Sequence, residues 1–311
     1  MGVAFSFTMN MKKYLIQFFI LIDSVITVTA FAQSNARNYK GIYVDGFDKI
    51  LGNKVKEDSL LNYCKSNGFN ALTTYRTKDI EKKIHITNPK TGGKTLSSFI
   101  KRAKNNYGII SFAMSSEQYE TFKNVVYKYN ASLKDTSERV NVFNFEFEYW
   151  NRHSTALDGY YCKKYLQPSG CSCDTAGAFK FYRKQMKSID SLAAKQHVKS
   201  EVYVGKPTAG QALVIANTVD RVLVDIYLKD PAKAYNRSTD RLTSFGEANK
   251  KITIIPIWGS TDEFMGEWQN SHPLSDADKH FMNDFNANKN KQQQNLTIAG
   301  FQWYKYSTMK K

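Results

Sequence analysis

The sequence has 311 residues, only 6 prolines and a formal net charge of +16 at pH 7. A positive surface attracts anionic polymers, but the lysines are scattered and form no stripe with aromatic residues, which argues against a nucleic-acid partner. No Ser/Gly-rich linker, low-complexity tract or short repeat divides the chain, so we expect a single large domain.

The first residues resemble a signal peptide. Lys12 and Lys13 precede an apolar run at 14–32, which ends in the small-x-small sequence Ala30-Phe31-Ala32. We therefore expect a signal peptide at 1–32, cleavage near Ala32, an exported protein (periplasmic, cell-surface or secreted) and one mature domain at 33–311. A retained membrane anchor is the alternative, but the run is short and Asp23 interrupts it. No later stretch is long and apolar enough to span a bilayer.

Strand-like and helix-like segments alternate along the rest of the chain. Strands are expected at 40–47, 69–75, 109–114, 140–150, 200–205, 220–228, 251–258 and 296–306. Helices are expected at 56–68, 96–108, 116–130, 175–196, 209–219 and 275–289, with another ending near Lys250. This order predicts an α/β fold, a (β/α)8 TIM barrel without a full last helix. A doubly wound open sheet is the alternative, but no Gly-rich phosphate loop follows the first strand.

The chain contains four cysteines, at 64, 162, 171 and 173. An even number in an exported chain permits disulfides. Cys171 and Cys173 are too close in sequence to pair comfortably with each other, so we expect Cys162 to bridge to one of them. Cys64 lies in a predicted helix and is expected to stay free. A zinc site, the alternative, lacks a second CxxC-type pair or a nearby pair of histidines.

The strand at 140–150 (VNVFNFEFEYW) carries the candidate site. Its alternation places three phenylalanines on the face toward the helices, and Asn144, Glu146 and Glu148 on the face toward the barrel interior. Buried carboxyls are costly unless they are paired or protonated, and the active sites of barrels lie at the C-terminal ends of the strands. We therefore predict a functional site here. The alternative is that the two glutamates are solvated or salt-bridged residues of the barrel rim.

This strand is similar to the DxxDxDxE motif on the fourth strand of glycoside hydrolase family 18 barrels. Asn141, Asn144, Glu146 and Glu148 fall at its four polar positions. The segment VLVDIYL places Tyr227 at the tyrosine of the Met-x-Tyr-Asp sequence that ends the family's sixth strand, with Asp225 at its methionine position. GFQWYKY places Trp303 where the family has a tryptophan floor under the sugar. SFAM at 111–114 lacks both glycines of the family's SxGG sequence.

The resemblance implies a glycosidase, a chitinase or endo-β-N-acetylglucosaminidase, that cleaves β-1,4-linked N-acetylglucosamine by substrate-assisted retaining catalysis. The implied catalytic residues are Glu148 as general acid, with Glu146 and Tyr227 holding the acetamido group. The expected substrate-binding residues are Asn144, Asp225, Trp258, Trp303 and Tyr75. We expect no metal and no cofactor, and a monomer whose partner is an N-acetylglucosamine-containing glycan.

Glu146 departs from the family pattern because the motif has aspartate there. The extra methylene moves the carboxylate by about 1.5 Å, and misplacements on the order of 1 Å can cost about a hundredfold in rate. The alternative is therefore a non-catalytic glycan-binding barrel of the same fold. Glu148→Gln distinguishes the two, because only an enzyme would lose turnover while it still binds the glycan.

Overall fold

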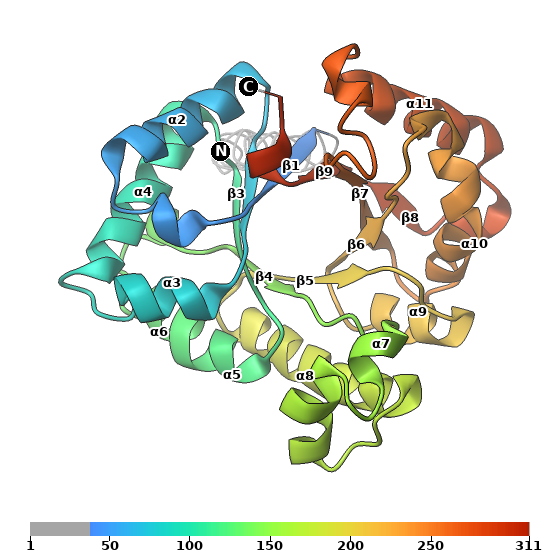
Figure 1. Cartoon of the computed structure of the whole chain (residues 1–311), viewed down its shortest axis with the longest axis horizontal. Coiled ribbons are helices and arrows are strands. Elements are labelled where there is room, and N and C mark those ends of the chain that lie inside the picture. Colours follow the sequence, from blue (N-terminus) through green and yellow to red (C-terminus); the bar gives the residue numbers. More distant parts are fainter. Residues whose placement is uncertain (1–37, 311) are drawn as a thin grey trace, which may run out of the picture. The chain divides into compact units, whose positions relative to one another are not determined.

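The structure, a computed structural model, describes residues 38–310 and contains a closed parallel β-barrel surrounded by helices (Figure 1). The predicted signal peptide lies outside the described residues. The barrel strands are β1 (Tyr39–Val44), β2 (Ala71–Thr74), β3 (Ser111–Ser116), β4 (Val142–Phe145), β5 (Lys199–Val204), β6 (Arg221–Asp225), β7 (Ile252–Gly259) and β9 (Gly300–Tyr304). The predicted TIM barrel is thereby confirmed, and the open sheet is excluded.

The barrel closes where strands from the two ends of the described chain pair with each other. β1 pairs with β9, β9 pairs with β7, and β7 pairs with β6, all in parallel. A short strand, β8 (Leu296–Ile298), pairs with the beginning of β7. The single strand predicted at 296–306 is therefore two strands. They meet at Gly300, whose φ of +139° and close approach to the Tyr39 carbonyl leave no room for a side chain.

Helices cover the outside of the barrel between successive strands. They are α2 (Lys54–Ser66), α3 (Thr77–Ile84), α4 (Gly92–Tyr107), α5 (Tyr119–Thr121), α6 (Tyr127–Ala131), α7 (Arg152–Thr155), α8 (Thr175–Lys195), α9 (Ala209–Ala216), α10 (Ala234–Gly246) and α11 (Leu274–Asn288). Side chains of Asn53, Asp174 and Thr208 cap α2, α8 and α9 by accepting hydrogen bonds from backbone N–H groups. After β9 the described chain forms only a 3-10 turn, at Tyr306–Thr308. This agrees with the prediction that the barrel lacks a full last helix.

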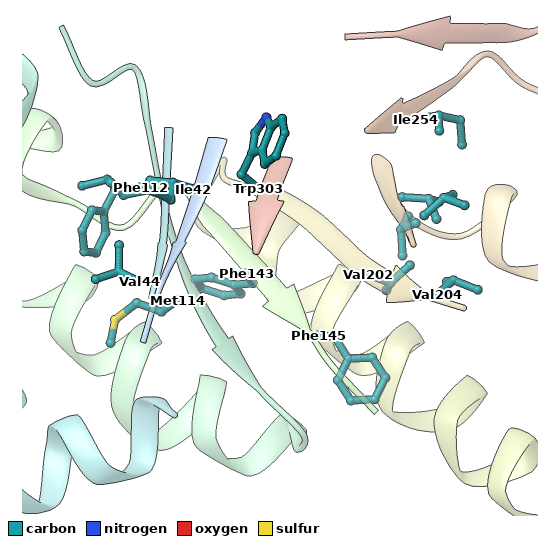
Figure 2. Packing of buried hydrophobic residues seen from close by; sticks show 14 of the residues in the cluster. Ile42, Val44, Phe112, Met114, Phe143, Phe145, Val202, Val204, Ile254 and Trp303 are labelled. Carbon is teal, nitrogen blue, oxygen red and sulfur yellow. The ribbon is translucent and has the colours of Figure 1, made fainter. Parts of the chain in front are cut away.

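The two faces of β4 lie where the sequence alternation predicts. Phe143 and Phe145 are fully buried and belong to the large hydrophobic cluster outside the barrel wall, together with Met114 and Val204 (Figure 2). Asn144, between them in sequence, is also fully buried but lies on the opposite, inward face. Tyr43 and other inward residues form a second, smaller cluster inside the barrel.

A long connection between β4 and α8 is closed by a disulfide. Cys162 bonds to Cys173 with a Cα–Cα distance of 5.1 Å, which confirms that Cys162 pairs with one of the two later cysteines. Cys64 is buried in α2 and unbonded, as predicted, and Cys171 is a free thiol. In residues 38–310, none of the helices has the length and apolar character of a membrane span.

We predict that replacing both Cys162 and Cys173 by Ala lowers the free energy of unfolding by about 3 kcal/mol, because the closed loop restricts the unfolded chain. Urea unfolding of the variant and the wild type measures this difference. Cys171→Ala is the matched control and should leave stability unchanged. Equal stability of the double variant and the wild type under oxidising conditions would contradict the expectation.

Candidate functional site

A column of polar side chains fills the barrel interior beneath the site. Asn144 Nδ2 donates a hydrogen bond of 2.7 Å to Glu201 Oε1, and Glu201 forms an ion pair with Arg221. Tyr43 lies 3.5 Å from Asn144, measured from its hydroxyl to Oδ1. Arg221 also lies over the ring of Tyr39, 5.2 Å from its centroid. The Glu201 charge, with no exposed surface, is therefore compensated inside the barrel.

A pocket of about 160 Å³ opens above this column, at the C-terminal ends of the strands. An apolar cavity of about 150 Å³ holds benzene, so the pocket has room for a group the size of one six-membered ring. Its lining is unusual in composition, since it consists of three glutamates and six tyrosines. These are Glu117, Glu146, Glu148, Tyr43, Tyr75, Tyr161, Tyr203, Tyr227 and Tyr304.

Glu146 is the group with the most perturbed acidity in the pocket. Burial raises its pKa to about 7, and hydrogen bonds from the side chains of Tyr43 and Ser115 partly oppose this rise. The neighbouring carboxyls of Glu148 and Glu201 raise the pKa further. Near neutral pH, Glu146 is therefore present in comparable amounts as acid and as base, which suits a group that transfers protons in both directions.

The other two carboxyls are held by polar partners at the rim of the pocket. Asn151 Nδ2 donates a hydrogen bond of 3.2 Å to Glu148. Glu117 accepts hydrogen bonds from the hydroxyls of Tyr160, at 3.1 Å, and Tyr165, and lies 3.7 Å from Lys164 Nζ. Sequence reasoning missed Glu117, although its position directly after the third strand marked it as a residue of the barrel mouth.

The structure brings together four of the residues predicted for the site. Glu146, Glu148, Tyr227 and Tyr75 all line the pocket. Asn144 lies below it, in the polar column.

Asp225, which was expected to bind substrate, does not line the pocket. Its carboxylate forms an ion pair of 2.6 Å with Arg241 and accepts a hydrogen bond of 3.4 Å from Tyr203. Asp225 therefore lies outside the pocket and helps to position Tyr203, which lines it.

Trp258 and Trp303 also lie outside the pocket. Both are fully buried in the cluster between the barrel and the helices, with ring centroids 6.1 Å apart, and Trp258 Nε1 donates to Asp278 at 2.8 Å. Their strands place Ile257 and Gln302 on the inward face, so the tryptophans face outward. The aromatic residue that β9 contributes to the pocket is Tyr304, one position later.

The residues described here contain no cluster of three or more His, Cys, Asp or Glu side chains that could hold a metal ion. The expectation that the protein needs no cofactor stays a prediction from the sequence.

Comparison with known proteins identifies no family. No protein-family profile matches the chain, and no curated protein matches it. Among solved structures, the AHE enzyme from Alicyclobacillus herbarius has a TM-score of 0.46 and 11% identity, over 81% of this chain and 76% of that one. An enolase protein from Sargasso Sea environmental sequencing has a TM-score of 0.38 and 10% identity, over 88% of this chain and 56% of that one.

These findings correct the assignment to glycoside hydrolase family 18. No protein-family profile, that of family 18 included, matches the chain, and no curated glycosidase matches it. The chitinase or endo-β-N-acetylglucosaminidase activity and the glycosidase classification that the resemblance implied are therefore wrong. In keeping with this correction, the tryptophan expected to form the sugar-site floor, Trp303, faces away from the pocket.

The raised pKa of Glu146 predicts a pH-dependent cost to stability. The pKa of Glu146 is about 7 in the folded protein and exceeds the ordinary value of 4.5. The protonated carboxyl therefore contributes its full stability below pH 4.5, and this contribution is lost as the pH rises through 7 and the buried group ionises. Glu146→Gln, which removes the charge, should therefore raise the free energy of unfolding at pH 8 by on the order of 1–3 kcal/mol. At pH 4.5 the variant should differ little from wild type.

Urea unfolding of both proteins at pH 4.5 and pH 8 measures this difference. Burial also raises the pKa of Asp278 to about 7, but that contribution is the same in both proteins and cancels. Glu263→Gln, at an exposed position, is the matched control and should give no gain at pH 8. A gain of the same size at both pH values would show that Glu146 carries no extra proton in the folded protein.

Proposed function

We propose that the barrel is an acid–base enzyme in which Glu146 exchanges a proton with a small, neutral substrate. The observation that carries this proposal is a carboxyl with a pKa of about 7 in a pocket of ring size at the C-terminal ends of the barrel strands. Catalytic groups work best when their pKa lies near the working pH, and an ordinary glutamate is ionised at neutral pH.

The neighbours of Glu146 support both halves of a proton-transfer cycle. The Glu146 carboxylate, which hydrogen bonds from Tyr43 and Ser115 stabilise, takes a proton from a substrate carbon next to a carbonyl. The electron pair of the broken C–H bond moves onto the carbonyl oxygen to form an enolate. Glu148 follows two residues later and lines the same pocket, so it supplies a second oxygen acceptor for the substrate. The Glu146 carboxyl exchanges its proton with solvent and returns one to the same carbon as the carbonyl forms again, which closes the cycle without any net change in the enzyme.

The lining also favours a particular kind of substrate. Three carboxyls line the pocket, and among the described residues that line it there is no Lys or Arg, so a negative charge on the reacting part is disfavoured. The tyrosines provide flat faces for stacking, and their hydroxyls can hydrogen bond. The best fit is a ring of about six atoms that carries hydroxyl or carbonyl groups.

A second candidate function is the binding of an organic cation. Aromatic rings and carboxylates together form the cages that bind quaternary ammonium groups, and this pocket has both. A bound cation would lower the pKa of Glu146, because it favours the carboxylate. A neutral substrate would leave that pKa near 7 or raise it by excluding water.

Solvent-exchange NMR tests the proposed function without knowledge of the product. Neutral ring compounds that bear hydroxyl or carbonyl groups are incubated with the protein in D₂O, and incorporation of deuterium is followed at positions next to the carbonyl. We expect exchange in at least one compound, with a rate that changes around pH 7. Glu146→Gln should lower the rate by about a hundredfold or more.

A control variant and an infrared titration complete the test. The control, Glu263→Gln, should exchange deuterium as the wild-type protein does. Infrared titration of the Glu146 carboxyl should give a midpoint near pH 7 that Glu146→Gln removes, and tetramethylammonium should leave it in place. A midpoint near 4.5, or unchanged exchange in Glu146→Gln, would contradict acid–base catalysis. A large downward shift with tetramethylammonium would favour the cation receptor.

Export of the chain, its monomeric state and an N-acetylglucosamine-containing glycan as its partner stay predictions from the sequence. Of these, the glycan can be tested with the same assay, since N-acetylglucosamine is a neutral ring that bears hydroxyl groups. Competition by the free sugar against a compound that undergoes exchange would support it as a ligand.

A further inference from the structure

A second cavity, of about 440 Å³, lies beside the acid pocket at the same end of the barrel. Its wall includes Trp150 and Arg152, which follow β4, and Lys206, which follows β5. The Trp150 ring packs on Tyr203, with centroids 5.6 Å apart, and Tyr203 lines the acid pocket. One layer of aromatic rings therefore separates the two cavities.

The charge of this second cavity is opposite to that of the acid pocket. Arg152 and Lys206 line it, and none of the described residues that line it is acidic. Within residues 38–310, neither cation has a carboxylate within 4.0 Å. Three cations line the cavity on the other side of the acid pocket: Arg76 and Lys164 are paired with Asp79 and Glu117, and Lys78 donates a hydrogen bond to Gln118. Arg152 and Lys206 are both exposed to solvent, and neither is part of an ion pair in the described part of the chain.

A buried polar group at this cavity also lacks a partner. Tyr149 lines the cavity and is only 1% exposed, yet its hydroxyl has no hydrogen-bond partner in the part of the chain that the structure describes. Such groups are rare in folded proteins and often indicate a missing ligand or water. In addition, Thr208 caps α9 at this cavity, and the N-terminal ends of helices favour negative charge, whereas the N-terminus of α8 is already occupied by the carboxylate of Asp174.

We infer that this second cavity binds an anionic group, a carboxylate, phosphate or sulfate, of the substrate whose neutral ring occupies the acid pocket. The binding of the anion stands on the cavity itself, whereas its assignment to the substrate rests on the proposed function. The Arg152 guanidinium offers a planar fork of donors to such oxygens, and the Lys206 ammonium adds a point charge.

Titration with inorganic phosphate, sulfate and acetate tests the anion site directly. Calorimetry should give saturable binding of at least one anion, and the backbone amide signals of Thr175 and Gln211 should shift with the same midpoint. In the double variant R152M/K206M the affinity should fall by about tenfold or more. The matched control R183M/K184M removes two exposed cations of α8 that line a different cavity, and should bind as wild type does.

Two outcomes of this titration would overturn the inference. The first is the absence of saturable binding and of amide shifts in the wild-type protein, which does not depend on whether any variant folds. The second is an equal loss of affinity in both double variants, because that would show only the general attraction of a chain with a net charge of +16.

A comparison of a neutral ring alcohol with its phosphate monoester tests the link to the substrate. The ester should bind about tenfold more tightly or better, and this preference should vanish in R152M/K206M but persist in Glu146→Gln. A preference that is absent, or that survives in R152M/K206M, overturns the link. Failure of proton exchange alone, with the preference intact, would contradict acid–base catalysis and still support the anion site.

Discussion

The buried ion pair between Glu201 and Arg221 is the interaction on which the rest of the barrel interior depends. Glu201 has no exposed surface, so without Arg221 its charge would be strongly destabilising. Because Glu201 accepts from Asn144 Nδ2, the amide is held with its oxygen toward Tyr43. At 3.5 Å the hydrogen bond from Tyr43 to that oxygen is long, and the Tyr43 hydroxyl also helps to lower the pKa of Glu146.

The presence or absence of an arginine partner distinguishes the carboxyls that stabilise the barrel from the carboxyl of Glu146. Glu201 and Asp225 each have an arginine, Arg221 and Arg241, and serve the structure of the barrel and its wall. Glu146 faces the pocket with only neutral donors and other carboxyls around it, and in the described part of the chain no Lys or Arg lies within ion-pair distance. An uncompensated carboxyl in such surroundings destabilises the fold when ionised, a cost typical of functional sites.

Periodicity predicted the barrel and the inward face of the fourth strand, because phenylalanines at 143, 145 and 147 leave one register for β4. The placement of Trp303 came from the family resemblance and was wrong, because Gln302 is the residue of β9 that faces inward and Trp303 beside it faces the helices. The pairings of Glu201 with Arg221 and of Asp225 with Arg241 join neighbouring elements only after folding. The family 18 resemblance misled because polar residues at the mouth belong to barrels of many functions.

The arrangement of charge around the pocket selects the orientation of a substrate as well as its identity. Glu117, Glu146 and Glu148 repel an anion from the acid pocket, whereas Arg152 and Lys206 attract it to the cavity behind Trp150. Attraction at one position and repulsion at the other together discriminate more strongly than either does alone. A ligand with one neutral and one anionic end therefore has a single favourable orientation, in which its neutral ring is next to Glu146. The Trp150 and Tyr203 rings lie between the two cavities, so a ligand that occupies both has to reach past these rings.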